Sequence, residues 1–265
     1  MKGPILFVGV ADESPLAMAI AAAKRLGLPQ LIIDQRQLTG QDVEIGIRRG
    51  QCFARWWSGS SEFDLTTCTG AYTRAIPASL VRDKAGGPHG VLHDHYFVDA
   101  LNAWLEVAPL RVANRLAAGC SNGAKTWQAQ QILAAGFNIP PSLISNDPDE
   151  VLAFRRQHRR LVFKSASGLR SIVTPLEGEH EARLDRIRVL PTLFQAYIPG
   201  VNYRVHVVDK QAFCTRIDSR ATDYRYAERE GCAAGMEADR LPDEVAQRCI
   251  RLAQRLGLVM AGIDL

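Results

Sequence analysis

A lysine inside an apolar strand is the first residue of this sequence that suggests chemistry. Lys164 interrupts the run LVFKSA (161–166), and the chain continues into the small residues Ser, Ala, Ser and Gly at 165–168. Small residues let backbone amides approach phosphate oxygens, and a lysine on the entering strand can neutralise their charge. An edge-strand lysine whose ammonium extends into water fits the same pattern equally well.

A second lysine, Lys125, lies in the segment GCSNGAKT (119–126). We expect Asn122 to cap a helix that runs to Gly136, with Lys125 in its first turn. The helix dipole disfavours a cation there, so Lys125 suggests a nearby anion, although an exposed surface lysine is the simpler alternative. The segment is one residue short of a P-loop, with Ala124 in place of a required glycine and no hydrophobic strand before it. A P-loop nucleoside triphosphatase is therefore a weaker alternative.

Gln195 and three arginines suggest the rest of a nucleotide site. Gln195 lies between apolar residues in TLFQAYIPG (192–200), where its amide and the backbone could hydrogen-bond a purine, or where the strand could simply end. Arg204, Arg216 and Arg225 follow on predicted strands or loops. Converging arginines would stabilise transferring phosphoryl charge, but three solvated arginines are equally compatible with the sequence.

Two other clusters are better explained without a ligand. His89, His93, Asp94 and His95 form the densest cluster of potential metal ligands. The His-Asp-His triplet at 93–95 lacks a spacing that places both of its histidines on one helical face, and we expect loop histidines without a metal. The basic run at 155–160 is typical of the solvated end of a helix rather than of a nucleic-acid contact.

The elements that must position these residues alternate between strands and helices. The N-terminal third predicts a parallel α/β unit, because a strand (5–10), a helix with Ser14 as its N-cap and Gly27 after its last turn, and a second strand (31–34) succeed one another. Further strands are expected at 52–57, 69–74, 161–166 and 171–176, an antiparallel hairpin at 203–208 and 212–217, and helices at 94–107, from Asp147-Pro148 onward and at 243–256.

Composition limits the protein class. The 265 residues predict about two domains, and a net charge of +4 with 47% hydrophobic and 23% charged residues excludes disordered, collagen-like and coiled-coil chains. No apolar run approaches the ~20 residues that a membrane helix needs, and the N-terminal run reads as a strand rather than a signal peptide. Six scattered cysteines without a C-x-x-C pair fit reduced thiols, and we expect a cytoplasmic protein.

The order of these features is more specific than any one of them. Lys125 opens a helix, Lys164 ends a strand before a small-residue loop, FQAYIPGVNYRVHVV (194–208) follows, and Asp-Tyr-Arg at 223–225 precedes the closing GLVMAGIDL (257–265). This order resembles the ATP-grasp superfamily, in particular its RimK-like branch, which includes the ligases that install cross-links in graspetide peptides. The resemblance covers residues 69–265, roughly, and extends less specifically to the N-terminal part.

The resemblance implies an α/β protein of α+β lobes, with a Rossmann-like pre-ATP-grasp domain at 1–110, a small lobe with the phosphate-binding lysines at 111–192 and an incomplete C-terminal lobe at 193–265. It implies ATP and Mg²⁺ as cofactors. The residues that match the superfamily's motifs are Lys125 and Lys164 for the phosphates, Gln195, Tyr197 and Ile198 for adenine, Asn202 for the ribose, Arg204 and Arg225 for the reaction centre, and Asp264 for magnesium.

The implied activity is an ATP-dependent ligase that joins a carboxylate to an amine or hydroxyl of a peptide or amino acid, without nucleic-acid or membrane partners. Similar enzymes continue into an E-x-N strand that completes the magnesium site, and this chain stops before it. We therefore expect a fragment of a longer enzyme, or else a degenerate member that binds nucleotide or peptide without catalysis. The sequence leaves a homo-oligomeric state open.

Overall fold

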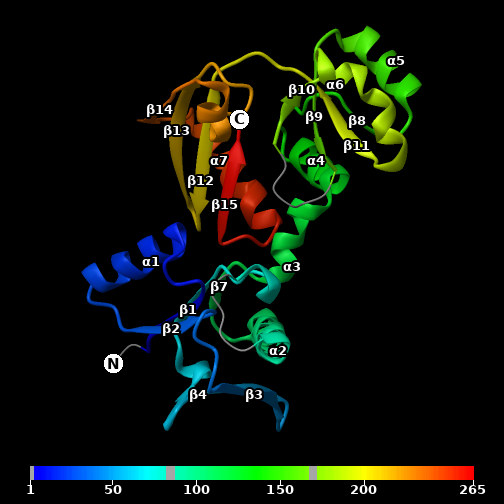
Figure 1. Cartoon of the computed structure of the whole chain (residues 1–265). Coiled ribbons are helices and arrows are strands. Elements are labelled where there is room, and N and C mark those ends of the chain that lie inside the picture. Colours follow the sequence, from blue (N-terminus) through cyan, green and yellow to red (C-terminus); the bar gives the residue numbers. More distant parts are fainter. Residues whose placement is uncertain (1–2, 82–86, 167–171) are drawn as a thin grey trace. The chain divides into compact units, whose positions relative to one another are not determined.

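The computed structural model describes residues 3–81, 87–166 and 172–265. The chain folds into two compact units (Figure 1). Unit 1 comprises Met1–Gly119 and unit 2 comprises Cys120–Leu265. Part of the predicted small-residue loop, at 167–168, lies outside the described residues, as does the start of the strand expected at 171–176.

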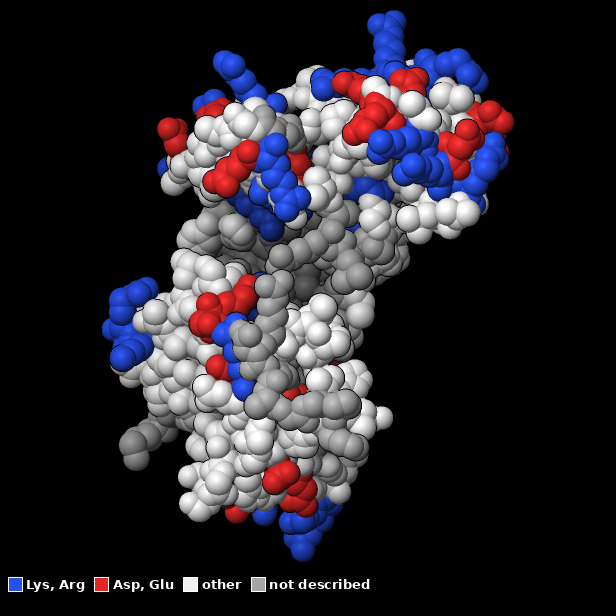
Figure 2. Space-filling view, in the orientation of Figure 1, with Lys and Arg blue, Asp and Glu red and all other residues white. Residues whose placement is uncertain are grey.

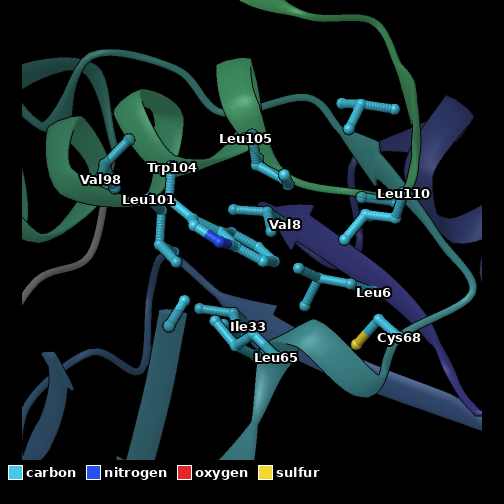
Figure 3. Close-up of a cluster of buried hydrophobic side chains, with 14 of the residues drawn as sticks. Leu6, Val8, Ile33, Leu65, Cys68, Val98, Leu101, Trp104, Leu105 and Leu110 are labelled. Carbon is cyan, nitrogen blue, oxygen red and sulfur yellow. The ribbon is translucent and has the colours of Figure 1, made fainter. Parts of the chain in front are cut away.

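Unit 1 is built on a four-stranded parallel sheet of order β2-β1-β6-β7. Its elements are β1 (Ile5–Gly9), α1 (Ser14–Arg25), β2 (Gln30–Asp34), η1 (Leu65–Thr67), β6 (Gly70–Thr73), η2 (Ala78–Leu80), α2 (Gly87–Val107), β7 (Arg111–Ala113) and α3 (Leu116–Gly119). Side chains of a strand alternate between its faces. Phe7 packs against Leu16 of α1, whereas Leu6 and Val8 pack around Trp104 of α2 (Figure 3), so each helix covers one face of β1.

A separate antiparallel sheet in unit 1 was only partly expected. It contains β3 (Gln41–Arg48), β4 (Gln51–Ser58) and β5 (Ser61–Asp64), of which the sequence predicted only the middle strand. Arg49 and Gly50 join β3 to β4, both with positive φ, as a two-residue hairpin turn requires. The sequence did not predict this hairpin, because β3 contains charged residues and the turn has an arginine where asparagine, aspartate or glycine is usual.

Unit 2 contains two antiparallel sheets, each covered by helices on one face. The β8–β11 sheet, of order β10-β9-β11-β8, comprises β8 (Ser142–Ser145), β9 (Leu161–Ser165), β10 (Thr174–Pro175) and β11 (Thr192–Ala196), together with α5 (Pro148–His158), α6 (Glu179–Ala182) and η4 (Leu184–Val189). Val151 of α5 packs against Leu161 and Phe194, which fixes the covered face of this sheet.

The β12–β15 sheet, of order β14-β13-β12-β15, comprises β12 (Asn202–Val208), β13 (Gln211–Ser219), β14 (Ala234–Asp239) and β15 (Met260–Asp264), with η5 (Tyr224–Glu230) and α7 (Asp243–Arg255). Cys249 and Ala253 of α7 pack against Val205 and Val207. The predicted hairpin at 203–217 is confirmed by the antiparallel register of β12 and β13.

Two predicted helix caps are wrong, and one predicted helix start is confirmed. Asp147 caps α5, accepting a hydrogen bond from the Asp149 amide at 3.0 Å. Helix α1 begins at Ser14, which leaves Glu13 in the cap position. Asn122 does not cap α4 (Lys125–Ala134), because residues 120–123 form their own 3₁₀ turn, η3 (Cys120–Gly123), and Ala124 takes the cap position.

Among the described residues, no helix has the length and apolar content needed to cross a membrane.

Candidate functional site

Lys164 lies on the face of the β8–β11 sheet opposite α5. Its neighbour Phe163 packs into the core under α5, so alternation places the half-buried Lys164 side chain on the opposite face. Lys164 is paired with Leu193 in the register of β9 and β11. Gln195, two residues further along β11, therefore shares this face, where its Nε2 donates to Ser142 Oγ at 2.9 Å.

Lys125 is the first residue of α4, and its Nζ donates to Asn122 Oδ1 at 3.2 Å. The far end of α4 is anchored on α7, since Arg248 Nη1 donates to the Gly136 carbonyl at 3.0 Å and Phe137 packs against the α7 core. The lysine is therefore held at a fixed helix start within unit 2.

The two lysines and Arg225 form one cluster of positive charge. Burial lowers the pKa of Lys164, and the charges of Lys125 and Arg225 lower it further, against the opposing effect of two carboxylates. Burial also lowers the pKa of Lys125, and the Arg225 charge adds to this. Lysines whose pKa values are lowered by burial and by neighbouring cations are positioned to receive an anion.

Asp264 lies on the open face of the β12–β15 sheet. Ala261 and Ile263 point into the α7 core, so Asp264 points to the other face, paired with Arg204 in the β12–β15 register. Arg204 Nη1 donates to Asp264 Oδ1 at 2.7 Å, and the Tyr224 hydroxyl donates to the same oxygen at 3.3 Å. Burial, followed by the Asp264 charge, raises the pKa of Tyr224, which keeps the phenol a donor at neutral pH.

Asp223 is a second carboxylate at the site, and it is 4% exposed. It binds Arg225 through both side-chain oxygens, with Arg225 Nε to Oδ1 at 2.8 Å and Nη2 to Oδ2 at 2.6 Å. Burial by itself raises the pKa of Asp223, but the hydrogen bonds from the Arg225 side chain and the Val173 amide outweigh it, so that the pKa lies below its ordinary value.

The predicted adenine hinge connects the two sheets of unit 2, between the end of β11 and the start of β12. The Tyr197 amide donates to the Arg160 carbonyl at 2.9 Å, and the Arg160 guanidinium lies 4.0 Å from the Tyr197 ring centroid. Ile198 is exposed. Asn202, the first residue of β12, shares the open face with Arg204 two residues later.

Together these residues place four cations, Lys125, Lys164, Arg204 and Arg225, against two carboxylates, Asp223 and Asp264. Such an excess of positive charge suits a polyphosphate. Within the described part of the chain, no three His, Cys, Asp or Glu side chains gather as a metal site.

Structural comparisons identify the fold. No protein-family model and no curated protein matches the sequence. The ATP-grasp ligase PsnB, solved with a phosphomimetic variant of a minimal precursor, Mg and ADP, is 24% identical, with a TM-score of 0.78 over 100% of this chain and 86% of PsnB. The macrocyclase MdnC from Microcystis aeruginosa MRC, bound with the precursor peptide MdnA, is 18% identical, with a TM-score of 0.76 over 98% of this chain and 86% of MdnC.

A RiPP-associated ATP-grasp ligase from Chryseobacterium gregarium, in complex with ADP and a leader and core peptide, is 14% identical, with a TM-score of 0.77 over 99% of this chain and 84% of that ligase. The chain has the ATP-grasp fold. The predicted resemblance to the ATP-grasp superfamily is thus confirmed at the level of fold, as is the expected mixed α/β class.

The ATP-grasp fold separates Arg216 from the other two predicted arginines. Arg216 shares a face with Cys214, which packs under α7, and Arg216 binds Asp218 at 3.0 Å on that side. The P-loop alternative also fails, because 119–126 follows helix α3 rather than a strand.

The two remaining predicted clusters make local contacts of their own. His93, Asp94 and His95 lie in α2 rather than in a loop, and the His93 ring contacts the buried Asp94. The basic run at 155–160 carries ion pairs from Arg155 to Glu181 and from Arg160 to Glu177. On the face shown in Figure 2, basic and acidic side chains alternate over the part of unit 2 that carries α5 and α6.

Three residues of the candidate site were not predicted individually. Asp223 and Tyr224 bind Arg225 and Asp264, and only their place in the Asp-Tyr-Arg motif hinted at a role. Gly262 leaves space for Arg204, because a Cβ there would lie 2.6 Å from the Arg204 Cζ. The motif GIDL contains this glycine, but its partner on β12 could not be read from the sequence.

Proposed function

We propose that this chain is an ATP-dependent ligase that joins a carboxylate to an amine or hydroxyl of a peptide or amino acid. The observation that carries the proposal is the cluster of Lys125, Lys164 and Arg225 within an ATP-grasp fold, in which burial first and neighbouring cations second lower both lysine pKa values. The structures of PsnB and the Chryseobacterium ligase hold ADP, and both also hold peptide, which supports a nucleotide at this cluster and a peptide substrate.

Each predicted residue has a role in this proposal. Lys125 and Lys164 bind the phosphates of ATP, while Gln195, Tyr197 and Ile198 bind adenine, largely through backbone groups. Asn202 binds the ribose, and Arg204 and Arg225 line the reaction centre. Asp264 would hold Mg²⁺, whose contribution when bound is to neutralise phosphate charge.

The reaction has two steps. A substrate carboxylate oxygen attacks the γ-phosphorus of ATP, the bond to the β-phosphate oxygen breaks, and ADP leaves with its electron pair. The amine or hydroxyl then attacks the acyl carbon, the carbon–oxygen bond to phosphate breaks, and inorganic phosphate and one proton are released. Lys and Arg side chains lower both barriers by positioning and by offsetting the negative charge that develops on phosphate oxygens.

The proposal keeps the order of the predicted domains, 1–110, 111–192 and 193–265, with the first boundary moved to Gly119, because β7 pairs with β6 in the sheet of unit 1. The parallel sheet of unit 1 supports a Rossmann-like pre-ATP-grasp domain at the N-terminus. Cys52, Cys68, Cys214 and Cys249 form no disulfides, which supports the cytoplasm as the location.

A non-catalytic ATP-grasp protein that binds nucleotide or peptide is the second candidate. This candidate is favoured by the carboxylates that could bind magnesium, because Asp264 already binds Arg204 and Asp223 already binds Arg225. ADP release in the presence of a carboxylate-bearing peptide separates the two candidates, since only the ligase produces it.

The first test is nucleotide-dependent thermal stabilisation of the full chain. ATP with Mg²⁺ at 100 times its Kd adds about 2.7 kcal/mol, which raises Tm by about 5–10 °C in a protein of this size. We expect Lys164→Met and Lys125→Met each to remove most of this shift. Lys210→Met, in the exposed β12–β13 turn, is the matched control and keeps it.

The P-loop alternative predicts a different pattern, in which Lys125→Met alone abolishes binding. No shift in the wild-type chain, or an unchanged shift in Lys164→Met, contradicts the proposed function.

A further inference from the structure

Asp223 is buried at a site whose other carboxylate is exposed, and its position requires an explanation. Its side chain is 3% exposed, whereas that of Asp264 is 59% exposed. A buried carboxylate is costly unless hydrogen bonds replace its water. Asp223 receives them from the Arg225 side chain, the Arg225 amide at 3.2 Å and the Val173 amide at 3.2 Å.

The contact with Arg225 determines how that guanidinium is turned. Nε and Nη2 donate to the two carboxylate oxygens at 2.8 and 2.6 Å, a side-on fork of charge-assisted bonds. The guanidinium is planar, so binding this edge directs the Nη1 end away from Asp223. The Arg225 side chain is 49% exposed, and the buried carboxylate of Asp223 therefore holds it in one orientation.

The contact with Val173 joins the two halves of unit 2. Val173 directly precedes β10 of the β8–β11 sheet, whereas Asp223 directly precedes η5, after β13 of the other sheet. Asp223 Oδ2 thus accepts from the Val173 amide on one side and from Arg225 Nη2 on the other. This one oxygen therefore connects the chain next to the β8–β11 sheet, which carries Lys164, with Arg225 of the same cluster of positive charge.

We propose that Asp223 is a positioning residue, which orients the Arg225 guanidinium and holds the chain at Val173 beside it. This inference rests on the proposed function in that the oriented guanidinium serves a phosphate group of ATP. Asp223 itself contacts neither nucleotide nor substrate and acts through Arg225.

A double-mutant cycle on the full chain tests the orientation. The probe is ATP with Mg²⁺, and its Kd is measured by isothermal titration calorimetry. Asp223→Asn places an amide N–H against the Arg225 donors, and we expect it to raise Kd about 10-fold, as loss of a charge-assisted pair does. Arg225→Met has a similar effect, and the double variant is no weaker than Arg225→Met alone.

Asp218→Asn is the matched control. Asp218 binds Arg216, and these two residues are also two positions apart in the sequence, but Asp218 is exposed. Asp218→Asn leaves Kd within about twofold of wild type, as surface pairs contribute little. If the Asp223→Asn and Arg225→Met effects instead multiply, to about 100-fold, Asp223 does not act through Arg225 and the proposal is overturned.

Amide hydrogen exchange tests the tie at Val173 without any nucleotide. We expect Asp223→Ala to speed exchange of the Val173 amide about 10-fold or more, because the side-chain acceptor of this amide is removed, while Asp218→Ala leaves it unchanged. Unchanged exchange in Asp223→Ala overturns the tie. A wild-type chain that binds no ATP contradicts the proposed function, and the exchange result still decides this inference.

Asp223→Glu is a second variant, for the case in which removing the charge of Asp223 prevents folding. It keeps the charge but lengthens the side chain by one methylene, which moves the guanidinium. We expect this variant to fold and to bind ATP several-fold more weakly, and wild-type affinity would count against positioning.

Discussion

Lys164 is a cation held partly out of water beside two other cations, and this placement weakens the folded state. Burial and the charges of Lys125 and Arg225 lower its pKa below the ordinary 10.5. Lys164→Met removes the repulsion, so we expect Tm of the nucleotide-free chain to rise by about 1–4 °C at pH 7, even though nucleotide binding is lost. Differential scanning fluorimetry of both chains measures this.

The sign of the pH dependence follows from the direction of the shift. Below the folded-state pKa the lysine is protonated in both states and its full cost is present. Between that value and 10.5 the unfolded chain binds more protons, so stability rises with pH. The advantage of Lys164→Met over wild type should therefore shrink as the pH approaches 10.5. A variant that melts below wild type at pH 7 contradicts this account.

The residue scale also shows how far motif reasoning reaches. Lys125 and Lys164 could be selected because each is unusual in its local context, at a helix start and inside an apolar strand. Asp223 could not be selected in this way, because an aspartate before a short helix is an ordinary cap. Its function depends on Val173, 50 residues away.

At the element scale, β15 is shaped to accept a side chain from β12. Gly262 is adjacent to Asp264 on the open face, and an added Cβ would overlap the Arg204 guanidinium. Its φ lies outside the left-handed region, so alanine is compatible with the strand backbone. Gly262→Ala should therefore leave the fold intact and displace Arg204 from Asp264.

We expect Gly262→Ala to raise the Kd for ATP with Mg²⁺ about 10-fold with a change in unfolding free energy below about 1 kcal/mol. Calorimetry and denaturant unfolding measure the two quantities. Gly235→Ala on β14 is the matched control, because its nearest contact would be the Asp218 carbonyl at 3.9 Å. Equal affinities of the two glycine variants would show that Arg204 does not need this space.

Elements with strong local signals were predicted well. The Asp147-Pro148 start of α5 and the alternating strands of the β12–β13 hairpin were both confirmed, because capping and alternation act over a few residues. The partners of β4 were missed, since their pairing depends on a turn at Arg49-Gly50 that lacks the usual sequence.

At the scale of the whole molecule, the two units have separate cores. Trp104 is 1% exposed in the core of unit 1 (Figure 3), and the cores under α5 and α7 belong to unit 2. Trp104→Ala should destabilise unit 1 by about 3–5 kcal/mol. ATP should continue to stabilise unit 2, because the predicted site residues all lie there.

Hydrogen exchange at α2 and α7 reports the two units separately, with and without ATP. Trp104→Phe is the graded control, since it keeps most of the packing and removes an Nε1 that has no hydrogen-bond partner within the described residues. Loss of ATP protection at α7 in Trp104→Ala would show that the units do not unfold separately.

The sequence by itself determined the α/β class, the two lysines and the motif order that resembles the ATP-grasp superfamily. These properties depend on local spacing and composition. Only the tertiary structure decided that Arg204 meets Asp264 across 60 residues, that Asp223 bridges two sheets, and that Arg216 points to the other face. Strand register and packing decide such contacts, because shifting a strand by one residue exchanges its faces while the local sequence stays the same.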